Sequence, residues 1–184
     1  MSPMSSRRVD RLHGYEHCHT EETRFAVTDR TDLNRAAVDE LTRRAHDVIA
    51  ANKYLTLATV DRDGIPWVSP VFFSPDGGTR FLWASSPDCL HSRNVAANAE
   101  VSLVVYDSSV RIGGARAVYV RAEAAVVPDA ELEHSASTYS GRLPEQRAFT
   151  VDDLQADLRL YQAVVSRSWV LVTGRDPDYG TDES

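Results

Sequence analysis

Residues 54–73 read YLTLATVDRDGIPWVSPVFF, and this stretch predicts the fold of the chain. Residues 54–60 alternate and are rich in β-forming side chains, which is typical of a half-buried strand. The DRDG sequence at 61–64 is a hairpin turn whose glycine can adopt a positive φ. Residues 67–73 form the second strand. Pro70 within it predicts an edge, a rim or a bulge, because proline donates no ladder hydrogen bond.

The same alternation recurs along the chain beyond this hairpin. A turn at 74–78 leads into a third strand, and a loop at 107–114 separates the fourth from the fifth. Proline at 128 ends the fifth strand because it cannot continue the ladder. The four further strands are predicted at residues 80–84, 101–106, 117–127 and 158–172.

Helical spacing is found on both sides of the strands. A helix is predicted from Asp32 to about residue 53, with one apolar face formed by Val38, Leu41, Ala45, Val48 and Ile49. A second begins with Ser86 as N-cap and runs through Asn98. A third covers 129–139, and a capping box at 150–153 predicts a short fourth helix.

The pattern of elements predicts a mainly β protein with flanking helices. Six strands in hairpin order, interrupted by one short helix, favour a closed or nearly closed antiparallel barrel. We expect residues 1–30 to be a flexible N-terminal arm and residues 31–173 to be the barrel domain, with a helical insertion at 128–158. Residues 174–184 are expected to be a polar tail.

Composition narrows the possible functions. The 184 residues include 20 basic and 27 acidic side chains, a formal net charge of −7, which argues against binding to nucleic acid or an anionic membrane. Cys18 and Cys89 are the two cysteines and do not form a disulfide framework. No apolar run approaches the roughly 20 residues that span a bilayer. Residues 1–10 lack the apolar stretch of a secretory signal, so we expect a cytoplasmic protein.

The junction between the third strand and the helix that follows has the features of an anion site. The first N–H groups of a helix lack internal partners, and the helix dipole places partial positive charge there. Ser85 and Ser86 add hydroxyls, and His91 and Arg93 follow within two turns. These residues suit a phosphate. The alternative is an ordinary capped helix with surface charges.

Five runs of sequence occur in a specific order. They are LATVDRDGIP at 57–66, WVSPVFF at 67–73, FLWASS at 81–86, HSRN at 91–94 and VSLVVY at 101–106. Together they resemble the pyridoxamine 5′-phosphate oxidase-like family, whose members fold as an FMN-binding split β-barrel. The resemblance extends from about residue 35 to 127 and implies a six-stranded antiparallel split barrel. It also implies a homodimer with the flavin at the subunit interface.

The resemblance also implies which residues contact the cofactor. In that family the second strand passes along the flavin, a place taken here by Ser69, Pro70, Val71, Phe72 and Ser74. The end of the next strand supplies a phosphate-binding hydroxyl, and this segment is Trp83, Ala84, Ser85 and Ser86. The following helix supplies basic side chains, where this chain has His91, Ser92 and Arg93.

Two departures from the family pattern limit what is carried over. His91 stands where a lysine is common, and Leu90 stands where the oxidases have an arginine. Residues 169–178 do not resemble the arginine-rich segment that grips the vitamin substrate of the true oxidases. The vitamin B6 substrate and its catalytic residues are therefore not carried over, and no catalytic residue is named.

Three functions agree with the sequence. The first is an FMN-dependent oxidoreductase acting on a small molecule, with hydride or electron transfer at the flavin. The second is a deazaflavin-dependent reductase on the same barrel, and the third is a non-catalytic protein that binds flavin, pyridoxal phosphate or haem. No metal site is predicted at His17, Cys18 and His19, because neighbouring side chains of an extended segment point apart and no fourth ligand is nearby.

Overall fold

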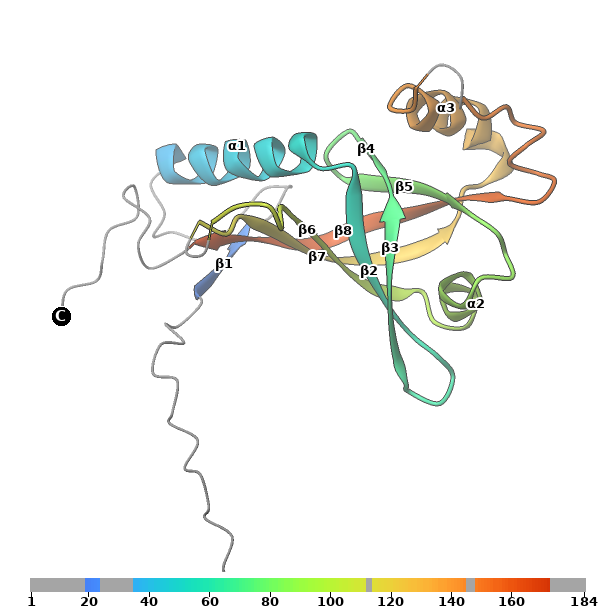
Figure 1. Cartoon of the computed structure of the whole chain (residues 1–184), viewed down its shortest axis with the longest axis horizontal. Helices are drawn as coiled ribbons and strands as arrows, with labels where there is room; N and C mark the ends of the chain where they lie inside the picture. The colour runs from blue at the N-terminus through green and yellow to red at the C-terminus, as the bar shows by residue number, and fades with distance from the viewer. Residues whose placement is uncertain (1–18, 24–34, 112–113, 145–147, 173–184) are drawn as a thin grey trace, which may run out of the picture.

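The computed structural model describes residues 19–23, 35–111, 114–144 and 148–172. In these residues eight strands form one antiparallel sheet, accompanied by three helices (Figure 1). The elements are β1 His19–Thr23, α1 Arg35–Ala51, β2 Tyr54–Val60, β3 Pro66–Phe72, β4 Ser74–Asp76, β5 Arg80–Ser85, α2 Leu90–Ala97, β6 Glu100–Tyr106, β7 Ala117–Val126, α3 Asp129–Ser140 and β8 Arg159–Val172.

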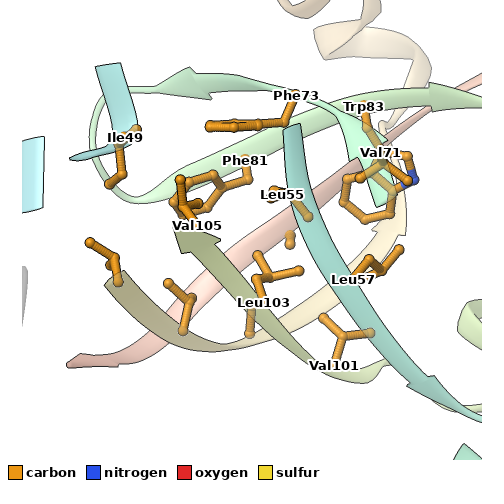
Figure 2. Close-up of a cluster of buried hydrophobic side chains, with 14 of the residues drawn as sticks. Ile49, Leu55, Leu57, Val71, Phe73, Phe81, Trp83, Val101, Leu103 and Val105 are labelled. Carbon is orange, nitrogen blue, oxygen red and sulfur yellow. The ribbon is translucent and has the colours of Figure 1, made fainter. Parts of the chain in front are cut away.

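The sheet curls around one hydrophobic core. The strand order of the sheet is β3-β2-β6-β7-β8-β5-β4, and β1 pairs with residues 168–172 at the C-terminal end of β8. Alternate residues of β2 and β6 are buried, so one face of each strand points inward. Figure 2 shows these side chains converging, with Ile49 of α1 beside them. The mainly β fold with antiparallel strands is therefore confirmed.

The curled sheet leaves a gap between β3 and β5. In the described sheet β3 is one edge and β4 the other, and no ladder joins β3 to β5. The chain itself closes one end of the gap, because β3 runs through Phe73 directly into β4, which pairs with β5. Pro70 lies on the edge strand β3, opposite Thr56 of β2. Its missing N–H is thus not required by a second neighbour, as the sequence predicted.

A second, smaller core lies on the outer side of β5 under α3. It contains Leu82 of β5, Leu132 and Tyr139 of α3, and Leu154 from the segment that returns to β8. Arg80 of β5 links the sheet to α3 beside this second core. Its guanidinium donates to Asp76 and Gln162 of the sheet and to Glu131 of α3.

Two strands were not predicted from the sequence. β1 lies within the segment expected to be a flexible arm, and it pairs with residues 168–172 of β8. β4 lies within the predicted turn at 74–78, where only Gly77 and Gly78 adopt positive φ. The expected count of six strands is therefore wrong. Both additions are short segments without the periodic apolar pattern that predicts a strand.

Two predicted helix starts are also corrected. Helix α2 begins at Leu90 with Cys89 as N-cap, not at Ser86. The Ser86 hydroxyl instead accepts the Asp88 N–H, and this local bond favours a turn before the helix. The capping box at 150–153 forms in both directions between Thr150 and Asp153, but turns rather than a helix follow it.

Arg142 joins the α3 layer to the end of α1. Its guanidinium donates to the carbonyls of Ile49, Ala50 and Asn52 at 3.0, 3.1 and 2.5 Å. It also lies 4.6 Å from the ring centroid of Phe73. The last carbonyls of a helix have no internal partner and carry partial negative charge, so a cation there is stabilising.

We predict that Arg142→Ala lowers the free energy of unfolding by about 2 kcal/mol, because several backbone carbonyls lose a charged donor. Thermal or denaturant unfolding measures the loss. The matched control is Arg43→Ala, since Arg43 is exposed on α1 and pairs with Glu40 and Asp47. Exposed pairs of this kind contribute about 0.5 kcal/mol or less. Equal losses in the two variants would contradict the assigned role of Arg142.

Candidate functional site

A histidine bridges the gap between β3 and β5 at the end away from the β3–β4 connection. The Nδ1 atom of His91 lies 3.2 Å from the hydroxyl of Ser69 on β3. Its Nε2 atom lies 2.9 Å from the hydroxyl of Ser85 at the end of β5. Both serines are buried and the histidine is partly buried. We call these three residues the Ser–His–Ser cluster.

The pleat of the two strands explains why these serines meet. Ser69 shares the inward face of β3 with Val71, and Ser85 shares the inward face of β5 with Trp83. Each serine therefore takes the position of an apolar core residue at the end of the gap that lies away from the β3–β4 connection. The turn at 86–89 then starts α2 at a position from which His91 reaches both hydroxyls.

The environment of the cluster favours a neutral histidine. Burial lowers the pKa of His91 below the ordinary histidine value, because the charged ring loses contact with water. The two serine hydroxyls supply neutral hydrogen-bond partners that either form of the ring can use. In the free protein at neutral pH, His91 is accordingly an uncharged bridge between two strands that are not otherwise paired.

Trp67 extends the cluster, although the sequence did not single it out. Its indole Nε1 donates to the Ser69 hydroxyl at 2.9 Å, and 46% of its surface is exposed. Trp67 precedes Ser69 by two residues on one strand, so both side chains point to the same face. That spacing was the available signal. An indole N–H donor and an open ring face make Trp67 part of the candidate site.

The rest of β3 divides between its two faces. Val71 points into the barrel core, whereas Phe72 points outward and packs edge-on against Tyr139 of α3. Pro70 is exposed. Ser74 is buried, and its hydroxyl donates to the carbonyl of Thr138 on α3. Of the five β3–β4 residues predicted to contact a cofactor, the structure brings only Ser69 into the cluster.

The remaining predicted residues lie around the cluster in different settings. Trp83 is fully buried in the core and stacks on Tyr161, with centroids 5.6 Å apart. Ala84 faces the second core. Arg93 is exposed on α2, and Ser86 lies in the turn before it.

Ser92 is buried beside His91 on the first turn of α2. Its hydroxyl has no hydrogen-bond partner among the described residues. An unpartnered buried hydroxyl is unfavourable by about 1–3 kcal/mol, so a bound ligand or an ordered water would stabilise it.

The donor set of the cluster suits a phosphate. The cluster contains hydrogen-bond donor groups, namely hydroxyls, an indole N–H and an imidazole, and the first N–H groups of α2 lie at Leu90 and His91. The set suits haem iron less well, because both nitrogens of His91 are already engaged by serines. Within the described ranges, no group of three or more histidine, cysteine or acidic side chains is arranged to hold a metal.

Among the described residues, no helix is both long enough and apolar enough to cross a bilayer.

Comparison with known proteins places this architecture among characterised folds. A haem-binding protein from Mycobacterium smegmatis matches with 20% identity and a TM-score of 0.60, over 73% of this chain and 58% of that chain. HutZ, a haem storage protein from Vibrio cholerae, matches with 21% identity and a TM-score of 0.54, over 76% and 95%. An FAD-binding protein from Mesorhizobium loti matches with 21% identity and a TM-score of 0.53, over 71% and 94%.

These identities establish a shared fold. The chain spans less than two thirds of the Mycobacterium smegmatis protein, and no curated protein matches it. A family model described as pyridoxamine 5′-phosphate oxidase, however, matches residues 41–165, from the middle of α1 into β8, and so includes the whole Ser–His–Ser cluster. The curled antiparallel sheet and this match over most of its length show that the chain belongs to the pyridoxamine 5′-phosphate oxidase family.

Proposed function

We propose that this protein is an FMN-dependent oxidoreductase acting on a small molecule, with the phosphate of FMN bound at the Ser–His–Ser cluster. The observation that carries the proposal is the convergence of Ser69, Ser85 and His91 from three separate elements on one point. Membership of a family that includes flavin enzymes supports the same cofactor. We also propose that the protein is cytoplasmic, as expected from the sequence.

Each residue of the site has a distinct role in this proposal. Ser69 and Ser85 donate hydroxyl protons to the phosphate, and His91 holds both hydroxyls in place. Arg93 and Ser86, at the rim, add charge and a further hydroxyl. FMN supplies hydride or electron transfer once bound. The protein binds the cofactor, orients it and limits access of water, and we assign no acid or base among its residues.

Two other functions follow from different ligands at the same cluster. A deazaflavin cofactor also carries a phosphate, and a non-catalytic protein would bind flavin, pyridoxal phosphate or haem without turnover. The haem-related names of two structural neighbours favour testing haem in particular. The visible absorption spectrum of the purified protein distinguishes these chromophores, and a haem spectrum would contradict the FMN proposal.

We also propose that the protein is a homodimer. The outer face of β2, β6, β7 and β8 has a hollow of about 400 Å³, lined only by strand residues. Among these, the side chains of Thr56, Ser102, Tyr119 and Trp169 form a surface with one charged group, Arg121, whose guanidinium lies 5.6 Å from the Trp169 ring centroid. A hollow with a single charged lining residue suits the centre of a self-complementary two-fold interface.

We predict that Ser85→Ala weakens FMN binding by about tenfold to a hundredfold, because it removes a hydrogen bond to a charged phosphate worth about 1.5–3 kcal/mol. Arg93→Ala is expected to cost less, about threefold to tenfold, because exposed charges are screened. Flavin fluorescence titration with FMN and with riboflavin measures both constants.

The comparison of FMN with riboflavin isolates the phosphate. Riboflavin lacks it, so its binding is expected to be the same in the variants and in the wild type. Ser137→Ala, an exposed serine on α3, is the matched control and should leave both ligands unaffected. If FMN binds Ser85→Ala as tightly as the wild type, the phosphate is not held at this cluster.

We predict that light scattering of the wild-type protein gives twice the chain mass of 20.4 kDa at micromolar concentration. Ser102→Arg places a charged side chain on the exposed hollow and should produce a monomer, whereas Ser137→Arg on α3 should not. A monomeric wild type with bound cofactor would refute the dimer. Two dimeric variants would instead place the interface on another face.

A further inference from the structure

The hydrogen-bond chain through His91 limits how many protons can point toward a ligand. The Trp67 indole N–H is a donor only, so the Ser69 oxygen accepts from it. A serine oxygen has two acceptor positions and one proton. Ser69 therefore has one acceptor position and one proton left for His91 and for any ligand.

A neutral imidazole must accept a hydrogen bond from one of its two serines. It carries one N–H and one acceptor nitrogen. One serine accepts from the ring, and the other must donate its own proton to the ring. Of the two hydroxyl protons, only one is then available to a ligand.

A protonated imidazole removes this restriction. Both of its nitrogens are donors, so Ser69 and Ser85 both accept from the ring. Ser69 then accepts from Trp67 and His91 together, and its proton is free to point elsewhere. Both hydroxyl protons and one positive charge become available at the same place, which is the arrangement that an anionic acceptor requires.

The charges around His91 do not hold it in the protonated state in the free protein. Burial is the cause of its lowered pKa. β3 carries no titratable side chain. The elements that contact α2 or carry the serines, with their ladder partner β8, have these titratable side chains: Tyr54 on β2, Tyr119, Arg121 and Glu123 on β7, Arg80 on β5, Arg159, Tyr161 and Arg167 on β8, and Asp88, Cys89 and Arg93 at α2.

Two positively charged residues in this set are neighbours of the cluster, Arg159 by strand pairing and Arg93 by position in the sequence. Arg159 is the register partner of Ser85, and Arg93 is two residues from His91. Neither guanidinium is a cause of the lowered pKa of His91, which comes from burial, and no acidic side chain raises it. The missing charge must therefore come from the ligand, since a phosphate is the group whose arrival would stabilise the imidazolium.

From this hydrogen-bond count we propose that binding of a phosphate monoester takes up one proton from solvent at His91. The imidazolium then donates to Ser69 and Ser85, and both hydroxyl protons turn to the phosphate. This inference rests on the proposed phosphate site and adds its regulation. A lysine would keep a fixed charge at this position, whereas His91 makes affinity for phosphate-bearing cofactors depend on pH.

The test is isothermal titration of FMN into the full-length protein at pH 7.5 in two buffers of different ionisation enthalpy. The difference in heat gives the number of protons taken up. The phosphate of FMN has a second pKa of about 6 and is mostly a dianion at this pH. We expect an uptake of about one proton, and FMN binding that weakens by up to about tenfold per pH unit between pH 7 and 8.5.

Two further measurements assign the proton to His91. The imidazole Cε1–H resonance of His91 in the wild type should titrate at higher pH with FMN than without it. His91→Lys carries a permanent charge and should bind FMN with little proton uptake and little pH dependence over this range. The wild-type measurements stand even if the variant does not fold.

The outcomes separate this inference from the proposed function. If FMN binds more tightly than riboflavin but without proton uptake, the cluster binds phosphate and the proton-linked inference is wrong. A His91 resonance that titrates at the same pH with and without FMN would also overturn the proton-linked inference. If FMN and riboflavin bind equally well, the proposed phosphate site and the inference both fail.

Discussion

An antiparallel sheet that curls to bury its inner face must either pair its two edges or cover them, because unpaired backbone groups in a core are costly. In this chain the gap falls between β3 and β5. The direct passage from β3 to β4 closes one end, and His91 bridges Ser69 and Ser85 at the other. The position of α2, the exposure of Trp67 and the chemistry of the candidate site all depend on this incomplete closure.

The same residues therefore serve structure and binding. A serine at an inward position of β3 or β5 buries less apolar surface than an aliphatic residue would. A buried serine is tolerated only if its hydroxyl is hydrogen-bonded. His91 supplies those bonds without introducing a fixed charge into a half-buried site. A lysine at this position would bind an anion more strongly, but it would need a counter-charge whenever the site is empty. With a neutral histidine, the Ser–His–Ser cluster carries no charge when no ligand is bound.

Much of the fold could be predicted because its strands show a local alternation of apolar and polar side chains. The hairpin 54–73 and the strands β5, β6, β7 and β8 follow from alternation and turn residues. β1 was missed because its HTEET sequence has no apolar side chain to alternate, and it joins β8 through the backbone. The start of α2 was placed too early, because Ser86 satisfies a turn N–H as readily as a helix N–H.

The sequence by itself determined which residues face inward and which residue types stand near a phosphate-like site, since side-chain direction in a strand and hydrogen-bonding capacity are local properties. Ser85 and His91 were identified from the strand–helix junction, whereas Ser69 was identified from the resemblance to the family. Only the tertiary structure decided that one histidine touches both serines, that Trp67 joins them and that Trp83 is enclosed in the core. Those contacts depend on how far the sheet curls, and curl is a property of the whole sheet that no single strand encodes.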